Sequence, residues 1–203
     1  MLRSTLIALA VVTAGAFDRS SPQDAAPDAR RQAVVSDTTS SSKRMADDHE
    51  WTTDNLKVRV DQSYCYDDTE WNCGRYGRLY TWEAAQQGCR LLGDGWRLPT
   101  NDEWQQLAKH YDGVADDSSD GAAAAYKALT IGGNSGFRAL LGGGRDLSDN
   151  HYGRLEAHGF YWTASESDPG NACFYNFANG RLALFRQRSG EKQRAFSVQC
   201  IRK

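Results

Sequence analysis

The chain has 203 residues, of which 40% are hydrophobic and 25% are charged, and its formal net charge at pH 7 is −2. This balance argues against a nucleic-acid-binding role, which usually requires a basic surface. Charge is nevertheless uneven, because seven basic residues follow position 180 and four aspartates crowd positions 112–120. Solvated faces would account for both clusters, as would charged partners.

The first 16 residues have the three regions of a secretory signal in the expected order. Arg3 supplies a positive charge, residues 6–12 form an apolar stretch, and residues 14–16 are the small residues of a cleavage site. The apolar stretch is too short to span a bilayer. We therefore predict an exported chain without a membrane span, located in the periplasm, at the cell surface or in the medium.

Residues 17–50 are rich in Ser, Asp, Ala and Arg and show no sustained periodicity, which predicts a disordered spacer. The folded domain is then expected over residues 51–203. This length of roughly 150 residues suffices for one hydrophobic core.

Apolar periodicity and turn residues predict the elements of this domain. A strand is expected over residues 51–60, followed by two main helices over 82–91 and 101–111. A short alanine-rich helix over 122–129 would be capped by Ser119 or Asp120. The glycines at 142–144 lack the spacing of a phosphate-binding loop and favour a turn or bulge. Further strands are expected over 137–141, 160–164, 172–177, 181–185 and 194–201, with a type I′ turn at Asn179-Gly180.

The helix over residues 101–111 has the clearest local signature. Thr100 and Glu103 form a capping box, in which the threonine oxygen accepts from the third helical amide and the glutamate reaches back to the cap. Apolar residues then follow at i, i+3, i+4 and i+7, from Trp104 to Tyr111. This helix is predicted to face a core.

Four blocks of sequence together resemble a known family. They are YGRLYTWEAA at 76–85, GWRLPTNDEW at 95–104, GFYWTASE at 159–166 and FSVQCIR at 196–202. In this order they resemble the Fibrobacter succinogenes major paralogous domain, a branch of the C-type lectin-like fold. The resemblance implies an α+β fold with two main helices packed on antiparallel sheets. It leaves the ligand open, because one fold hosts many functions.

The resemblance also implies which of the five cysteines form disulfides. A similar segment in the family suggests a bridge between Cys65 and Cys73, and C-type lectin-like folds usually tie a helix to the chain terminus, which pairs Cys89 with Cys200. The second bridge would contribute about 4–5 kcal/mol by restricting the unfolded chain. Cys173 is left over, either as a buried, inert thiol or as an exposed one that faces a ligand.

No metal site and no cofactor are predicted. Residues 116–121 match the first half of an EF-hand loop, but Lys127 stands where a bidentate Glu is required, which leaves a helix-capping turn or weak calcium binding. The sequence contains neither the Glu-Pro-Asn or Gln-Pro-Asp loop nor the Trp-Asn-Asp strand of calcium-dependent lectins, and its four histidines lack metal-ligand spacing. Formylglycine-generating relatives hold copper through paired cysteines, whereas only Cys173 and Cys200 lie in the C-terminal part here. We predict that the chain is not an enzyme, with a formylglycine-type or other cryptic enzyme as the alternative.

The predicted function is ligand binding through the C-terminal strands. Residues 162–188 mix aromatic, amide and guanidinium side chains, which offer contact area and directional donors at modest entropic cost. Because strand side chains alternate, about half must face the core, including Phe177 and Leu182 or Leu184. The candidate ligand-binding residues are Trp162, Ser165, Glu166, Asn171, Cys173, Tyr175, Asn176, Arg181, Arg186 and Arg188.

The arginines around the predicted hairpin favour a protein or glycan partner that is acidic or rich in carbonyl groups. The segment also resembles the variable region of C-type lectin-like proteins that retroelements diversify at adenines, since most residue types over 171–190 are reachable from an asparagine codon. Ordinary drift gives similar mixtures. A structural envelope module is a third possibility, and the oligomeric state is left open.

Overall fold

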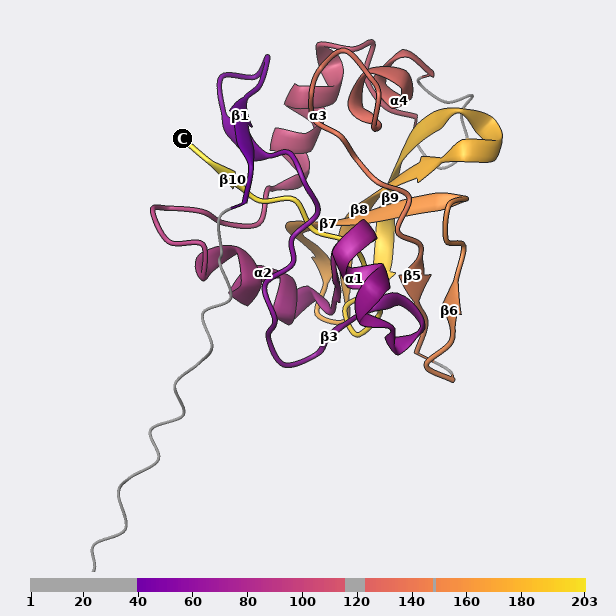
Figure 1. Cartoon of the computed structure of the whole chain (residues 1–203). Helices are drawn as coiled ribbons and strands as arrows, with labels where there is room; N and C mark the ends of the chain where they lie inside the picture. The colour runs from indigo at the N-terminus through magenta and orange to yellow at the C-terminus, as the bar shows by residue number, and fades with distance from the viewer. Residues whose placement is uncertain (1–39, 116–122, 148) are drawn as a thin grey trace, which may run out of the picture. The chain divides into compact units, whose positions relative to one another are not determined.

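The computed structural model describes residues 40–115, 123–147 and 149–203. Within this part of the chain, helices and short antiparallel strands form an α+β domain (Figure 1). The predicted signal sequence, most of the predicted spacer, the predicted caps Ser119 and Asp120 and the aspartate-rich segment 116–121 lie outside the described residues.

The helices are α1 (Glu70–Tyr76), α2 (Trp82–Arg90), α3 (Asn101–Lys109) and α4 (Ala123–Leu129), with 3-10 turns at Tyr66–Asp68 and Asn179–Arg181. The strands are β1 (Ser42–Arg44), β2 (Glu50–Thr52), β3 (Ser63–Tyr64), β4 (Leu79–Tyr80), β5 (Gly144–Arg145), β6 (Tyr152–Gly153), β7 (His158–Asp168), β8 (Asn171–Ala178), β9 (Ala183–Glu191) and β10 (Ile201–Arg202). The two main helices and the alanine-rich helix are confirmed, each within two residues of the predicted ends.

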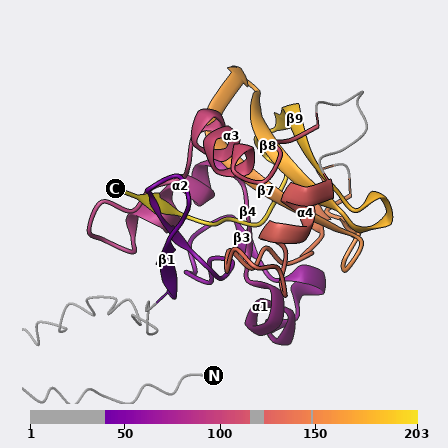
Figure 2. The same ribbon diagram turned by 90° about the horizontal axis from the view of Figure 1, so that it is seen from above.

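The principal sheet is the antiparallel set β7-β8-β9. Tyr161 lies opposite Tyr175, and the pairing continues from Tyr175 to Arg186. Because paired residues share a face and side chains alternate along a strand, Tyr161, Tyr175 and Phe177 project from the same face. Helices α3 and α4 lie over that face, and together they enclose the first core (Figure 2).

Helix α3 begins as the capping box predicts. Thr100 Oγ1 accepts from the Glu103 amide at 3.2 Å, and the Glu103 carboxylate accepts from the Thr100 amide at 2.8 Å. The apolar stripe is buried through the helix, and the Trp104 ring stacks on Tyr175 with centroids 4.9 Å apart. The predicted core-facing side of this helix is confirmed.

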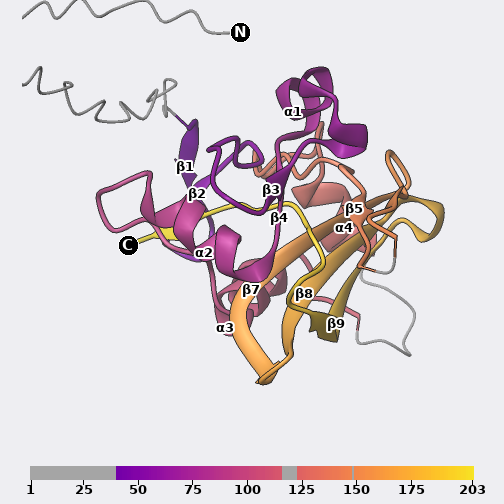
Figure 3. The same cartoon turned by 90° about the horizontal axis from the view of Figure 1, so that it is seen from below.

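The second core lies on the other face of the principal sheet, where α2 packs alongside β7 (Figure 3). Trp162, Phe174 and Phe196 form an aromatic cluster there. The indole N–H of Trp82 donates to the Thr163 carbonyl at 2.7 Å, so this buried donor is satisfied.

A small sheet, β1-β2-β10, joins the two ends of the described domain. Lys43 pairs with Trp51, which also pairs with Ile201. The folded domain therefore starts before residue 51, and the predicted spacer extends too far in the C-terminal direction. Sequence patterning missed this region because its one large apolar side chain before Trp51, the buried Met45, gives no periodicity.

Several predicted strands are shorter than expected. The strand predicted over residues 51–60 ends at Thr52, and the one predicted over 194–201 is reduced to isolated bridges before β10. Residues 137–141 form no strand and contribute one bridge, between Ala139 and Thr130. The apolar residues of these segments pack as irregular chain. A short apolar run in a sequence does not show whether the segment forms a strand or irregular chain.

The β8–β9 connection is a hairpin, but its turn differs from the predicted type I′ turn. The last pair is Ala178 with Ala183, so four residues form the loop, and Leu182 takes a left-handed conformation at φ 49° and ψ 46°. The Asn179 side chain, which a type I′ turn would leave at the tip, accepts from the Tyr126 hydroxyl at 3.1 Å. A tertiary contact has overridden the local turn preference.

Both predicted disulfides are present, Cys65–Cys73 and Cys89–Cys200, with Cα atoms 4.9 and 5.6 Å apart. Cys173 is a free, half-buried thiol. The segment that the first bridge closes contains a 3-10 turn and the start of α1. Two disulfides in one small domain are consistent with an oxidising compartment.

Candidate functional site

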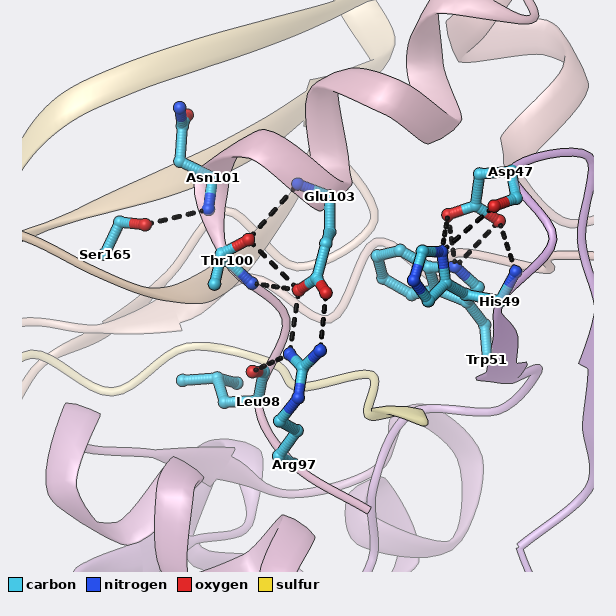
Figure 4. A network of polar contacts seen from close by, with 9 residues as sticks. All are labelled: Asp47, His49, Trp51, Arg97, Leu98, Thr100, Asn101, Glu103 and Ser165. Carbon is cyan, nitrogen blue, oxygen red and sulfur yellow. Dashed lines mark hydrogen bonds and ion pairs between the residues drawn. The ribbon is translucent and has the colours of Figure 1, made fainter. Parts of the chain in front are cut away.

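The block at residues 95–104 builds the entry to α3. The Arg97 guanidinium donates two hydrogen bonds to the Glu103 carboxylate, at 2.8 and 2.5 Å, and Glu103 also accepts from the Thr100 amide and hydroxyl (Figure 4). Burial favours the neutral form of Glu103, but these hydrogen bonds outweigh it and lower the pKa from 4.5 to about 2. The carboxylate is therefore ionised at neutral pH, and its hydrogen bonds hold the entry to α3.

Two of the predicted ligand-binding residues belong to the cores. Trp162 and Tyr175 are both 0% exposed. The Trp162 indole donates to the Tyr80 carbonyl at 2.8 Å, and the Tyr175 hydroxyl donates to the Asn101 carbonyl at 3.2 Å. The prediction that these two side chains face a ligand is wrong, because each is enclosed by the helix that packs on its face of the sheet.

Ser165 and Cys173 also have structural surroundings. The Ser165 hydroxyl accepts from the Asn101 amide at 2.9 Å, at the start of α3 (Figure 4). Cys173 lies in the central strand, where burial raises the pKa of its thiol despite the opposing charges of Arg186 and Arg188. A raised pKa keeps the thiol protonated. Because the thiolate is the reactive form, the surroundings of Cys173 do not favour a reactive cysteine.

Of the other predicted residues, Arg186 and Arg188 lie along β9, where Arg186 pairs with Tyr175, and the remaining four lie toward the two ends of the sheet. Glu166 and Asn171 lie at the β7–β8 turn, where Glu166 accepts from Lys192 at 2.7 Å. Asn176 and Arg181 lie toward the β8–β9 loop, where the Asn176 side chain contacts His158. The ten predicted residues therefore do not form one continuous surface.

A groove of about 740 Å³ lies at the β7–β8 end of the sheet. Its walls come from β3, the start of α2, the β5–β6 hairpin, the β7–β8 turn and the residues after β9. We call it the polar groove, and its lining residues are Gln62, Tyr64, Thr81, Glu83, Arg145, Leu147, Asn150, Pro169, Gly170, Asn171, Glu191, Lys192 and Gln193. Of the predicted residues, Asn171 lines it and Glu166 contacts its lining residue Lys192.

Two cations of the polar groove are held against aromatic rings. The Arg145 guanidinium lies 4.0 Å from the centre of the Tyr64 ring, and the Lys192 ammonium lies 4.4 Å from the Trp82 ring. Tyr152, also close to Arg145, donates to Asp68 at 2.6 Å. Burial and the neighbouring Asp68 raise the pKa of Tyr152, so its hydroxyl stays protonated and acts as a fixed donor.

One group of side chains has the composition of a metal site. Cys65, Glu70 and Cys73 bring their ligand atoms within 4.8 Å of one another. The two sulfurs are joined in a disulfide, and the buried Arg78 guanidinium lies 3.3 and 3.4 Å from them. An oxidised pair beside a fixed cation does not fit a metal ion.

Fold and site together define an α+β domain held by two disulfides, with a polar groove at one end of its principal sheet. The sequence model of the Fibrobacter succinogenes major domain family matches residues 36–202. The chain belongs to this family. Comparison with curated proteins and with solved structures found no significant match. Among the described residues, no helix has the length and apolar character needed to cross a membrane.

Sequence reasoning missed most of the polar groove. Arg145, Tyr64 and Lys192 come from segments far apart in the chain, and none belongs to a recognisable motif. The one available signal was the departure from apolar periodicity around the glycines at 142–144. It indicated a turn, but not which residues lie beside that turn in the fold.

Proposed function

We propose that the chain is an exported binding domain, without catalytic activity, that recognises a protein or glycan through the polar groove. The observation that carries this proposal is the groove itself, a hollow of about 740 Å³ lined by amides and by charges of both signs. A hollow of several hundred Å³ with a few converging polar groups is the default hypothesis for a binding site.

The held cations support recognition of acidic or carbonyl-rich groups. Arg145 and Lys192 each rest on an aromatic ring, so less side-chain entropy is lost when a ligand binds. A guanidinium stacked by its face keeps its edge donors in one plane, the geometry that pairs with a carboxylate. The partner class predicted from the sequence is retained, but its contacts move from the β8–β9 hairpin to the opposite end of the sheet.

We also propose that the fold is a branch of the C-type lectin-like fold. The Cys89–Cys200 bridge ties α2 to the chain terminus, the link that such folds usually have. The same bridge supports binding over formylglycine-type catalysis. Because it occupies Cys200, the C-terminal part keeps only the Cys173 thiol, and a copper site would need two. Export is supported by both disulfides.

Glycan and peptide arrays probed with the full chain would test the proposal. We expect a ligand that carries acidic groups, and binding should persist in EDTA because no calcium motif is present. Replacing Arg145 by Gln should weaken that binding by about 1–3 kcal/mol. The matched control is Arg59→Gln, which removes an equal charge from a side chain that is 79% exposed and lies outside the groove.

Thermal melting would separate binding from folding, because Arg145 also packs on Tyr64. A second variant, Gln193→Ala at the exposed rim, should weaken binding with no change in melting temperature. Loss of binding in Arg59→Gln equal to that in Arg145→Gln, or binding that requires calcium, would contradict the proposal.

A further inference from the structure

A second hollow lies at the other end of the principal sheet, where β7 begins and β8 turns into β9. His158 pairs there with Ala178, which pairs with Ala183. A cleft of about 270 Å³ opens at this point, lined by His158, Ala178, Gly180, Arg181, Phe185 and Gln187. We call it the hairpin cleft. It shares no lining residue with the polar groove.

The strand register places the cleft on one face of the sheet. Antiparallel partners share a face and side chains alternate, so His158, Ala178, Phe185 and Gln187 project together. This is the face opposite Tyr175, and α3 and α4 therefore do not fill it. Nearly buried Phe185 and Ala178 form an apolar floor, and the polar groups surround it.

The loop that carries Gly180 and Arg181 is anchored in place. Asn179 donates its backbone N–H to the Ala157 carbonyl at 2.9 Å, and its side-chain oxygen accepts from the Tyr126 hydroxyl at 3.1 Å. These contacts come from two different elements and fix the loop against the body of the domain. A ligand would therefore meet a preformed wall, which reduces the entropy lost on binding.

The imidazole of His158 is also held. Its Nδ1 lies 2.9 Å from Asn176 Oδ1, and its ring stacks on Phe160 with centroids 5.4 Å apart. Because a carboxamide oxygen only accepts, Nδ1 is the donor, and Nε2 is left to form a hydrogen bond with a ligand. The cleft thus offers Nε2 of His158, an amide from Gln187 that both donates and accepts, and the planar cationic fork of Arg181.

We propose that the hairpin cleft binds a single sugar ring that carries a carboxylate, as in a hexuronic acid residue. Arg181 pairs with the carboxylate, because a guanidinium matches its two oxygens. Gln187 and His158 hydrogen-bond to ring hydroxyls, and the apolar floor receives the C–H face of the ring. The volume of about 270 Å³ falls just below the range of pockets for drug-sized ligands, as a one-ring ligand requires.

Calorimetric titration of the full chain with glucuronate, glucose and acetate tests this assignment. Glucuronate should bind about tenfold more tightly than either glucose or acetate, because each lacks one set of polar partners. Arg181→Gln should remove the preference for glucuronate over glucose, whereas Gln187→Ala should weaken both sugars. Arg59→Gln, with an equal loss of charge away from the cleft, should bind as the wild type does.

Two results would overturn the proposal. Equal affinities for acetate and glucuronate would mean that the cleft recognises only the negative charge of the ligand. Loss of glucuronate binding in the groove variant Gln193→Ala, with Arg181→Gln unaffected, would place the sugar in the polar groove. The two hollows are tested by separate variants. If the hairpin cleft does not bind the sugar, the proposed function of the polar groove is unaffected. If the groove does not bind a ligand, the proposal for the cleft is likewise unaffected.

Discussion

Replacing Glu103 by Gln removes one charge from the start of α3 with almost no change in side-chain volume. The pKa of Glu103 is about 2 in the folded chain against an ordinary value of 4.5. Taken alone, this difference corresponds to about 3 kcal/mol of stability at neutral pH. The Glu103 side chain is 13% exposed, but its partner Arg97 is 42% exposed, so solvent screens part of the interaction. We expect Glu103→Gln to lose about 2 kcal/mol at pH 7.

The expected loss depends on pH in a definite direction. Because folding lowers the pKa of Glu103, the ionised carboxylate stabilises the fold above 4.5 and ceases to do so as the pH falls toward 2. At pH 3 less than half of the contribution remains, and the wild type and Glu103→Gln should then differ by about 1 kcal/mol or less. The pKa of Glu50 is lowered by hydrogen bonds from Arg202 and Ser42, and Glu50 titrates in both the wild type and Glu103→Gln. Only the difference between the two free energies of unfolding therefore reports on Glu103.

Urea denaturation followed by tryptophan fluorescence at pH 7 and pH 3 measures these differences. Asp102→Asn is the matched control, because its carboxylate is exposed in the same helical turn and accepts from the neighbouring Asn101 side chain at 3.2 Å. That variant should lose only the interaction with the helix dipole, about 0.5 kcal/mol. An equal loss at both pH values, or losses that match in the two variants, would refute the assignment of the stability to the Arg97–Glu103 pair.

Three further changes probe the scaffold through the free energy of unfolding. Tyr175→Ala should cost about 3–5 kcal/mol, and a loss below about 1 kcal/mol would mean that the ring faces solvent. Replacing both Cys89 and Cys200 by Ala should cost about 4–5 kcal/mol, while full stability under reducing conditions would contradict the bridge. Gly77→Ala should cost more than about 1 kcal/mol, because φ is +80° and a Cβ would lie 2.5 Å from that of Asn55. If the stability of Gly77→Ala were unchanged, the positive φ of Gly77 would be ruled out.

Features that depend on neighbouring residues could be predicted from the sequence. The capping box needs only Thr100 and Glu103, three residues apart, and the apolar face of α3 follows from helical periodicity. The disulfides required the family resemblance as well, because spacing alone does not give connectivity. What the sequence supplied here was local chemistry together with a known scaffold.

Features that depend on distant contacts could not be predicted. Asn179-Gly180 has the composition of a type I′ turn, yet the contact of Asn179 with Tyr126, 53 residues away, gives a longer loop. Tyr175 was assigned to a ligand surface because tyrosine is common at interfaces, but the alternation of β8 turns it toward Trp104. Residue type suggested the function of this side chain, and the packing of α3 decided its position.

The residues that identify the family are almost entirely separate from those that line the polar groove and the hairpin cleft. The blocks at 76–85, 95–104, 159–166 and 196–202 supply Trp82, Trp104 and Trp162 to the cores, and they also form the entry to α3. Of the residues lining the polar groove, only Thr81 and Glu83 fall within these blocks, and none of those lining the hairpin cleft does. Substitutions of the exposed lining residues should therefore leave the packing of the cores intact, so one scaffold could carry different binding surfaces. For this reason the family match establishes the scaffold, whereas the ligands proposed above depend mainly on side chains between the blocks.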